Sequence, residues 1–350
     1  MTVIHWDFGS AYDFFISLVV IHHPDRFGLR GAWAAGVRSR FSPEERQFLE
    51  EAINFFPVPI SWINQLPIEN KSARAILDAL AALPPEKRLI SLYKPSRMTE
   101  EVISTINQIH SNQMITSEDL EILRPVFQRR STPLKTRDLQ RIAEVFLNPG
   151  AFGESLLNLM QAYYQVFFEE EEERILPSLK EGIFNAQKQA EIQPFTELLE
   201  DLSHGVKLEN IEQYKKITLA PSYWTSPLIF FNNPKPDELL VVFGCRQETE
   251  NLVPGEYVPE SLVLGLKALA DSTRLRILHY LDQGATTPSD LARRLRLRAP
   301  TVIHHLNTLR LVGLVQVTLT ANGDRRYSLR QEAVEDTFAQ LNSVIKTDTI

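Results

Sequence analysis

Cysteine, glycine and long apolar runs are all scarce in this chain of 350 residues. Its one cysteine, Cys245, excludes a disulfide framework and a thiolate metal cluster, which favours a reducing, cytoplasmic setting. With 14 glycines, the chain has no glycine-rich phosphate loop. The apolar run 14–21 contains Ser17 and is far shorter than a bilayer span, and residues 1–7 have no basic leader. We therefore expect no membrane partner.

Acidic residues exceed basic ones overall, and the formal net charge is -7. Residues 261–330 reverse this balance, because they hold eleven Lys and Arg against four Asp and no Glu. Charge of one sign that is confined to one segment indicates a polyanionic partner for that segment alone. The alternative interpretation is ordinary variation of surface charge.

Helical periodicity dominates residues 1–200, and Ser42-Pro-Glu-Glu45 has the pattern of a capping box at a helix start. Proline-broken apolar runs follow over residues 206–246 and predict a small antiparallel sheet, which the N-terminal strand 2–8 can join. The predicted fold class is mainly α with this small antiparallel β-sheet, that is, α+β. We expect the glutamate run 169–173 to be a solvated helix face without a function.

Residues 251–260 have the proline and glycine content of a linker between domains. The sequence thus predicts a mostly helical N-terminal domain over residues 1–250 and a C-terminal domain over residues 261–350.

The C-terminal domain has the pattern of a winged helix-turn-helix. Leu275, Leu278 and Leu281 mark one helix, and a short turn centred on Leu297 separates the next two helices. Two helices joined by so short a turn place the second one in the major groove of DNA. Residues 314–329 then alternate around Asn322-Gly323, the preferred turn of a two-residue β-hairpin, and so predict a wing.

This domain resembles the ArsR-type winged-helix repressors. The matching stretches are Leu266-Lys-Ala-Leu-Ala-Asp-Ser-Thr-Arg-Leu-Arg-Ile-Leu278, Pro288-Ser-Asp-Leu-Ala-Arg-Arg-Leu295 and Pro300-Thr-Val-Ile-His-His-Leu-Asn-Thr-Leu-Arg-Leu-Val-Gly-Leu-Val315. The resemblance implies binding to double-stranded operator DNA, usually repression, and a homodimer formed through the first and last helices of the domain. Residues 1–45 are also similar to the N-terminal region of longer, poorly described members.

The sequence departs from the metal sensors of that family. Those proteins carry a Cys-x-Cys motif on the third helix or histidines on the last one, whereas residues 286–291 have no cysteine and residues 331–345 have no histidine. Thiolate and imidazole ligands are therefore missing from both places. We predict no metal site and no other cofactor.

The candidate DNA-binding residues follow from the helical period. If Val302, Leu306 and Leu309 form the buried side of their helix, the opposite arc faces DNA, and the surrounding arginines contact phosphates. The predicted DNA-binding residues are Arg293, Arg294, Arg298, Thr301, His304, Asn307, Thr308, Arg325 and Arg326. We expect His305, which flanks the buried side, to be half-buried and hydrogen-bonded to the backbone.

An apolar stripe on the last helix, spaced four, three and four residues, predicts the two-fold seam of a dimer. The predicted dimer-interface residues are Leu262 and Leu266 of the first helix with Val334, Phe338, Leu341 and Ile345 of the last helix.

For the N-terminal domain we predict either the sensing of a small-molecule effector or a role in setting the assembly. Its aromatic residues, among them Trp33, Tyr163 and Trp224, either line an apolar effector pocket or belong to the core. The chain has no catalytic motif, so we expect no enzyme and name no catalytic residue. The leading hypothesis is a DNA-binding transcriptional repressor, and the alternative is an interaction protein that uses its winged helix for docking or dimerisation.

Overall fold

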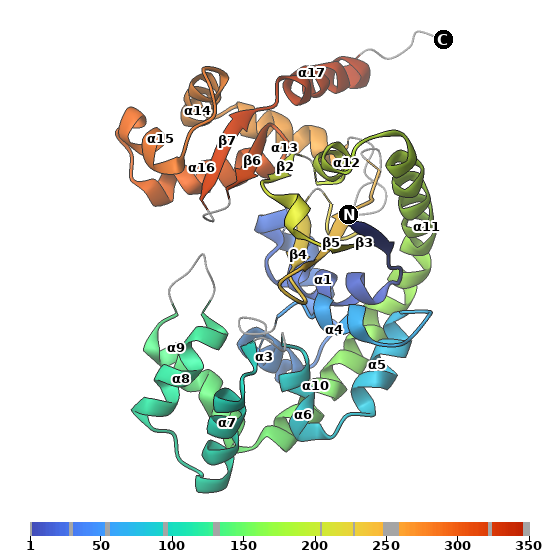
Figure 1. The fold of residues 1–350 in the computed structure, drawn as a ribbon, viewed down its shortest axis with the longest axis vertical. Helices are drawn as coiled ribbons and strands as arrows, with labels where there is room; N and C mark the ends of the chain where they lie inside the picture. The colour runs from blue at the N-terminus through green and yellow to red at the C-terminus, as the bar shows by residue number, and fades with distance from the viewer. Residues whose placement is uncertain are drawn as a thin grey trace.

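The computed structural model describes residues 2–27, 31–52, 57–93, 97–128, 134–203, 205–226, 228–247, 259–320 and 324–345. Figure 1 shows a large helical body that carries a small sheet, with a smaller C-terminal module packed on it. The helices of the body are α1 (Ala11–His22), α2 (Gly31–Arg38), α3 (Pro43–Ala52), α4 (Ile60–Gln65), α5 (Ala73–Ala81), α6 (Pro85–Ser91), α7 (Glu100–Asn112), α8 (Ser117–Phe127), α9 (Thr136–Glu144), α10 (Pro149–Tyr163), α11 (Glu169–Ile192) and α12 (Phe195–Leu202). The predicted mainly helical fold is confirmed.

The capping box predicted at the start of α3 is present. The Glu45 carboxylate accepts a hydrogen bond from the Ser42 amide at 2.9 Å, and the Ser42 hydroxyl accepts one from the Glu45 amide at 3.2 Å. Between α10 and α11, a π-helical turn (Tyr164–Phe168) joins the two helices into one long path along the body (Figure 1).

The sheet of the body contains β1 (Val3–Trp6), β3 (Lys216–Ser222), β4 (Ile229–Asn232) and β5 (Glu238–Gly244), in the order β1-β3-β5-β4. The N-terminal strand does join this sheet, as predicted, by pairing with β3. The prediction of an antiparallel sheet is wrong, because β1 and β5 both run parallel to β3 and only β4 is antiparallel to its neighbour.

The apolar character of β5 accounts for its position inside the sheet. Leu240 and Val242 point into the large core of the body, whereas Leu239, Val241 and Phe243 point into a second core on the other face. A strand that is buried on both faces belongs in the middle of a sheet. Hence β5 lies between β3 and β4, and the chain reaches it from β3 by way of the edge strand β4.

The C-terminal module contains α13 (Glu260–Leu269), α14 (Ser272–Asp282), α15 (Pro288–Leu295), α16 (Ala299–Leu311), β6 (Val315–Leu319), β7 (Arg325–Leu329) and α17 (Gln331–Ile345). This order of helices followed by a hairpin is the predicted winged helix-turn-helix. The helix marked by Leu275, Leu278 and Leu281 is present as α14, in which Leu278 and Leu281 are buried. Leu275 is 49% exposed, and Ile277 is fully buried. The predicted hairpin turn, Asn322-Gly323, lies outside the described residues.

The body contributes a third strand to the wing. Strand β2 (Val206–Leu208) runs parallel to β6, with Val206 opposite Val317 and Leu208 opposite Leu319. Residues 206–208 therefore belong to the wing sheet and not to the sheet predicted over residues 206–246. Of the predicted linker, residues 251–258 lie outside the described residues, so the domain division at 251–260 stays a prediction.

Candidate nucleic-acid interface

The sequence sets the helix-turn-helix geometry through its capping residues. The Thr287 hydroxyl accepts a hydrogen bond from the Asp290 amide at 3.2 Å, and Pro288 occupies the first turn of α15. The residue after α15 is its C-cap, Arg296, whose left-handed φ of 56° turns the chain sharply. The Leu297 amide then donates to the Ala292 carbonyl at 3.0 Å, which closes the turn before α16 begins.

One side of α16 is buried and the other side faces solvent, as predicted. Val302, Leu306 and Leu309 are fully buried in the core of the module. On the opposite side Thr301, His304 and Asn307 are exposed.

Thr308 and His305 differ from this simple division. Thr308 is half-buried, and its hydroxyl donates to the His304 carbonyl at 3.1 Å. His305 is half-buried as predicted, but Nδ1 is buried and has no hydrogen-bond partner among the described residues, so the predicted backbone bond at this atom is wrong. Burial lowers the pKa of His305, against the opposing effect of the Asp271 carboxylate. The lowered pKa favours the neutral form of the His305 ring.

Three predicted arginines surround the start of α16, and all are exposed. Arg293 forms an ion pair with Asp290 one turn earlier, and the Arg294 guanidinium lies 5.7 Å from the centre of the Tyr280 ring. Arg298 is the N-cap residue of α16, and its side chain makes no capping hydrogen bond. An exposed ion pair of this kind contributes little to stability, so Arg293 is free to exchange Asp290 for a phosphate.

The two predicted wing arginines are exposed near the end of the hairpin. In the register of the wing, Arg325 lies opposite Leu319 and Arg326 opposite Thr318. Successive residues of a strand point to opposite faces, so Arg325 shares its face with the buried Tyr327 and Arg326 lies on the other face. The wing thus presents positive charge on both of its faces.

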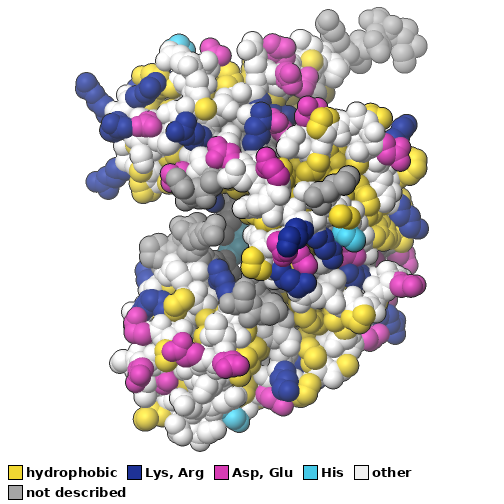
Figure 2. Space-filling view, in the orientation of Figure 1, with side chains coloured by type: hydrophobic (Ala, Val, Ile, Leu, Met, Phe, Trp, Pro, Cys, Tyr) yellow, Lys and Arg dark blue, Asp and Glu magenta, His cyan; other side chains and the backbone are white. Residues whose placement is uncertain are grey.

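Sequence reasoning missed Arg296, which is exposed in the turn between α15 and α16. Its left-handed conformation gave no sequence signal, because this conformation usually favours glycine or asparagine. In Figure 2, Lys and Arg side chains gather over the end of the C-terminal module that carries α15, while acidic side chains are scattered over the body.

Comparison with known proteins supports this geometry. The family model described as "Bacterial regulatory protein, arsR family" matches residues 271–317, from the N-cap of α14 into β6. The arsenical resistance operon repressor of Staphylococcus aureus is 33% identical over 82 residues, which are 23% of this chain and 77% of that repressor. This chain belongs to the ArsR family. It is therefore a DNA-binding transcriptional regulator with a winged helix-turn-helix.

The last helix of the ArsR-family module carries an apolar stripe that its own chain leaves largely uncovered. Phe338 is 50% exposed and Ile345 is 67% exposed, whereas Leu341 and Val334 are half-buried. The two predicted interface residues on α13, Leu262 and Leu266, differ in burial. Leu266 is half-buried, but Leu262 is only 2% exposed, so its side chain lies inside the chain and not on the surface of the described residues.

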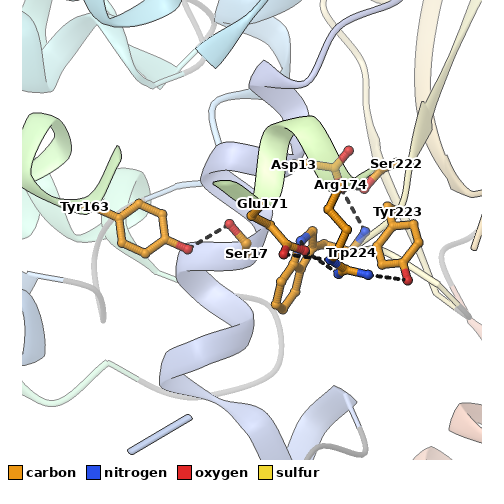
Figure 3. Close-up of polar contacts among 8 residues, drawn as sticks. All are labelled: Asp13, Ser17, Tyr163, Glu171, Arg174, Ser222, Tyr223 and Trp224. Carbon is orange, nitrogen blue, oxygen red and sulfur yellow. Dashed lines mark hydrogen bonds and ion pairs between the residues drawn. The ribbon is translucent and has the colours of Figure 1, made fainter. Parts of the chain in front are cut away.

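The N-terminal body of this ArsR-family chain holds a buried polar cluster that joins α1, α11 and β3 (Figure 3). Asp13 of α1 accepts hydrogen bonds from the Ser222 hydroxyl at 2.6 Å and from the Trp224 amide at 2.8 Å. Burial raises the pKa of Asp13 to about 7, although the hydrogen bonds from Ser222 and Trp224 act in the opposite direction. The Asp13 carboxyl therefore keeps its proton to a much higher pH than an ordinary aspartate.

The other part of this cluster contains Glu171, which contradicts the expectation that the glutamate run 169–173 is a solvated helix face. Glu171 is buried, forms an ion pair with Arg174 and accepts a hydrogen bond from the Trp224 indole at 2.9 Å. Arg174 also donates to the Tyr223 hydroxyl at 3.0 Å. At least this glutamate of the run is therefore structural and not solvated.

The three aromatic residues of the body named in the sequence analysis, Trp33, Tyr163 and Trp224, belong to the core or pack against it. Tyr163 and Trp224 are fully buried, and the Trp33 ring stacks on the Trp224 ring with 5.7 Å between their centres. No helix in the described part of the chain is both long and apolar enough to cross a membrane. Among the described residues, no group of three or more His, Cys, Asp or Glu side chains is placed to hold a metal ion.

Proposed function

We propose that this chain is a dimeric, sequence-specific repressor of transcription that acts in the cytoplasm on double-stranded operator DNA. The observation that carries the proposal is the division of α16, because Val302, Leu306 and Leu309 are fully buried while the opposite side is open. A helix held in this way can enter the major groove without disturbing the core of its module.

Phosphate contacts supply most of the proposed affinity. Exposed arginines frame α16 from the turn before it and from the wing after it. Contacts of this kind position a protein on DNA, and sequence is read by side chains that reach base edges. In our proposal Asn307 pairs with an adenine edge, and Thr301 meets a thymine methyl group or a phosphate.

The proposed dimer uses α17. An uncovered stripe that includes Phe338 and Ile345 is typical of a surface that pairs with its own copy. Leu266 of α13 lies at the side of this stripe in the proposal, whereas Leu262 contributes from within the module. Two α16 helices related by this two-fold axis would read two half-sites of one operator.

The N-terminal body is proposed to sense a small-molecule effector, and we assign it no catalytic role. The observation that supports this role is the pairing of β2 of the body with β6 of the wing. A change in the body that moves β2 would move the wing relative to α16.

Fluorescence polarisation with promoter fragments, including the region upstream of the chain's own gene, tests the proposal. We expect binding that weakens steeply between 50 and 200 mM salt, by about 10³-fold or more if six or more phosphates are contacted. Absence of salt-sensitive binding to every promoter fragment would reject it. Capture of a protein partner that persists unchanged at high salt would favour the docking alternative.

A further inference from the structure

A cavity lies between the body and the C-terminal module, and none of the proposed DNA-binding residues lines it. Its volume is about 160 Å³, and its walls come from the segment after β5, from α13, from the end of α16 and from α17. The cavity therefore touches the helix proposed to read DNA, the helix proposed to form the dimer and the body at the same time.

An occupant of this cavity would contact the reading helix directly. His304, Thr308 and Leu311 are spaced four and three residues apart, so they form one row on α16. The first residue of the row is exposed, and the last one lines the cavity. Leu311 therefore lies on the same side of α16 as His304, which is proposed to contact DNA.

The cavity also reaches the C-terminal end of the wing hairpin. Arg330 follows β7, lines the cavity and donates to the Gly313 carbonyl at 3.2 Å. A Cβ added at Gly205, just before β2, would lie 2.9 Å from the Arg330 side chain. Arg330 thus lies between the end of α16 and the strand that the body contributes to the wing.

The shape of the cavity limits the size of its ligand. Phe27, Leu264, Leu311, Val312 and Ala333 supply an apolar wall. An apolar cavity of about 150 Å³ in another protein accommodates benzene, so this wall suits an apolar group of roughly that size.

The charges of the cavity indicate the chemistry of the ligand. Arg330 and Asp336 both line it, and the described residues place no opposite charge within ion-pairing distance of either one. The two other charged residues of the lining, Arg246 and Glu260, are again one of each sign, and Arg246 donates to the Ser226 carbonyl at 3.2 Å. A ligand that carries both a carboxylate and an ammonium group complements such a lining, whereas a purely anionic ligand would face Asp336.

We propose that this cavity binds a free α-amino acid with an apolar side chain the size of a benzyl or isobutyl group. The carboxylate pairs with Arg330, the ammonium group pairs with Asp336, and the side chain lies against Leu264 and Leu311. We also propose that the bound amino acid changes the affinity for DNA, and this regulatory part rests on the proposed function. The binding of the amino acid does not depend on the proposed function.

Isothermal titration calorimetry on the full chain, without DNA, tests the site. The probes are L-phenylalanine and L-leucine, with 3-phenylpropionate, phenethylamine and glycine as analogues that each lack one feature. We expect the two amino acids to bind, and each analogue to bind at least about tenfold more weakly, because each loses one charge pair or the apolar contact. No heat of binding from either amino acid at millimolar concentration overturns the proposal, as does equal binding of the analogues.

Variants locate the site. Asp336→Asn removes a charge from an exposed position of α17 and should weaken phenylalanine binding at least about tenfold. Leu264→Trp should abolish binding by filling the cavity. The matched control is Glu332→Gln, an equal charge change on the same helix outside the lining, which should leave the affinity within about twofold. Full affinity in Asp336→Asn places the amino acid elsewhere and overturns the assignment.

Polarisation with bound DNA tests the coupling separately. Saturating phenylalanine should change the affinity for DNA about fivefold or more, and DNA should change the affinity for phenylalanine by the same factor. Amino-acid binding without any change in DNA affinity rejects the regulatory role. If DNA does not bind at all while phenylalanine does, the proposed function fails and the ligand site stands.

Discussion

At the residue scale, Asn307 is the side chain with the clearest proposed contact to a base. It is exposed on α16, one turn after His304, and its amide can both donate to and accept from an adenine edge. We expect Asn307→Ala to lower the affinity for the preferred operator by about 1–3 kcal/mol and to relax the preference for one base pair. Competition binding with single-base variants of the operator measures both effects.

Binding to unrelated DNA provides the internal reference for this variant, since phosphate contacts are unchanged. Asn112→Ala, an exposed asparagine on α7, is the matched control and should bind like the natural chain. A uniform loss of affinity across all sequences would show that Asn307 does not read a base.

Arg298 is predicted to contact a DNA phosphate. Its exposed side chain makes no capping bond at the start of α16, so its charge can meet the DNA backbone. Arg298→Gln should reduce the slope of log affinity against log salt by about one unit, equally for all sequences. Lys188→Gln on α11 removes the same charge from an exposed position of the body and should not alter the slope. An unchanged slope in Arg298→Gln would exclude a phosphate contact at this position.

At the element scale, α17 is the helix that we propose forms the dimer. We expect Phe338→Asp to place a charge in the proposed seam and to shift the chain from dimer to monomer in sedimentation velocity at micromolar concentration. Because Phe338 is 50% exposed within one chain, the unfolding midpoint of the monomer should change little. The control is Ser343→Asp, which adds the same charge at an exposed polar position of α17. Equal sedimentation of both variants would place the seam elsewhere.

The elements of the C-terminal module could be predicted from the sequence because their signals are local. Thr287 and Pro288 mark a helix start, and the apolar spacing of Val302, Leu306 and Leu309 fixes one buried face. Exposure of single residues within an element was less predictable. Leu275 and Ile277 are both apolar, and which of them is buried depends on how α14 is rotated against its neighbours.

The strand pairing of the body could not be predicted, because it is not local. Strand β1 pairs with residues 216–219 across most of the body, and β2 pairs with residues 317–319 of the wing. A strand of three residues such as β2 has too few positions to show alternation. The same limit applies to Glu171, whose burial depends on Arg174 and on the indole of Trp224 from a distant part of the chain.

At the scale of the whole molecule, the body and the winged helix form one connected structure. Strand β2 extends the wing sheet, and the turn before it contains Gly205 at a φ of 93°, a conformation that strains other residues. The cavity with its proposed amino acid lies at the same junction. In the proposed function, a signal received by the body would reach the wing through β2.

We expect the buried cluster of the body to make the stability of the molecule depend on pH. The pKa of Asp13 is about 7 in the folded chain against an ordinary value of 3.8, so folding retains a proton that the unfolded chain releases. The free energy of unfolding should fall as pH rises from about 4 to about 7, by an amount of order 4 kcal/mol, and level off above. In urea unfolding at pH 5 to 8, Asp13→Asn should flatten this dependence, whereas Asp138→Asn at an exposed position of α9 should leave it. Parallel curves for the natural chain and Asp13→Asn would contradict the assignment, because a carboxyl that ionises equally in both states cannot couple folding to protons.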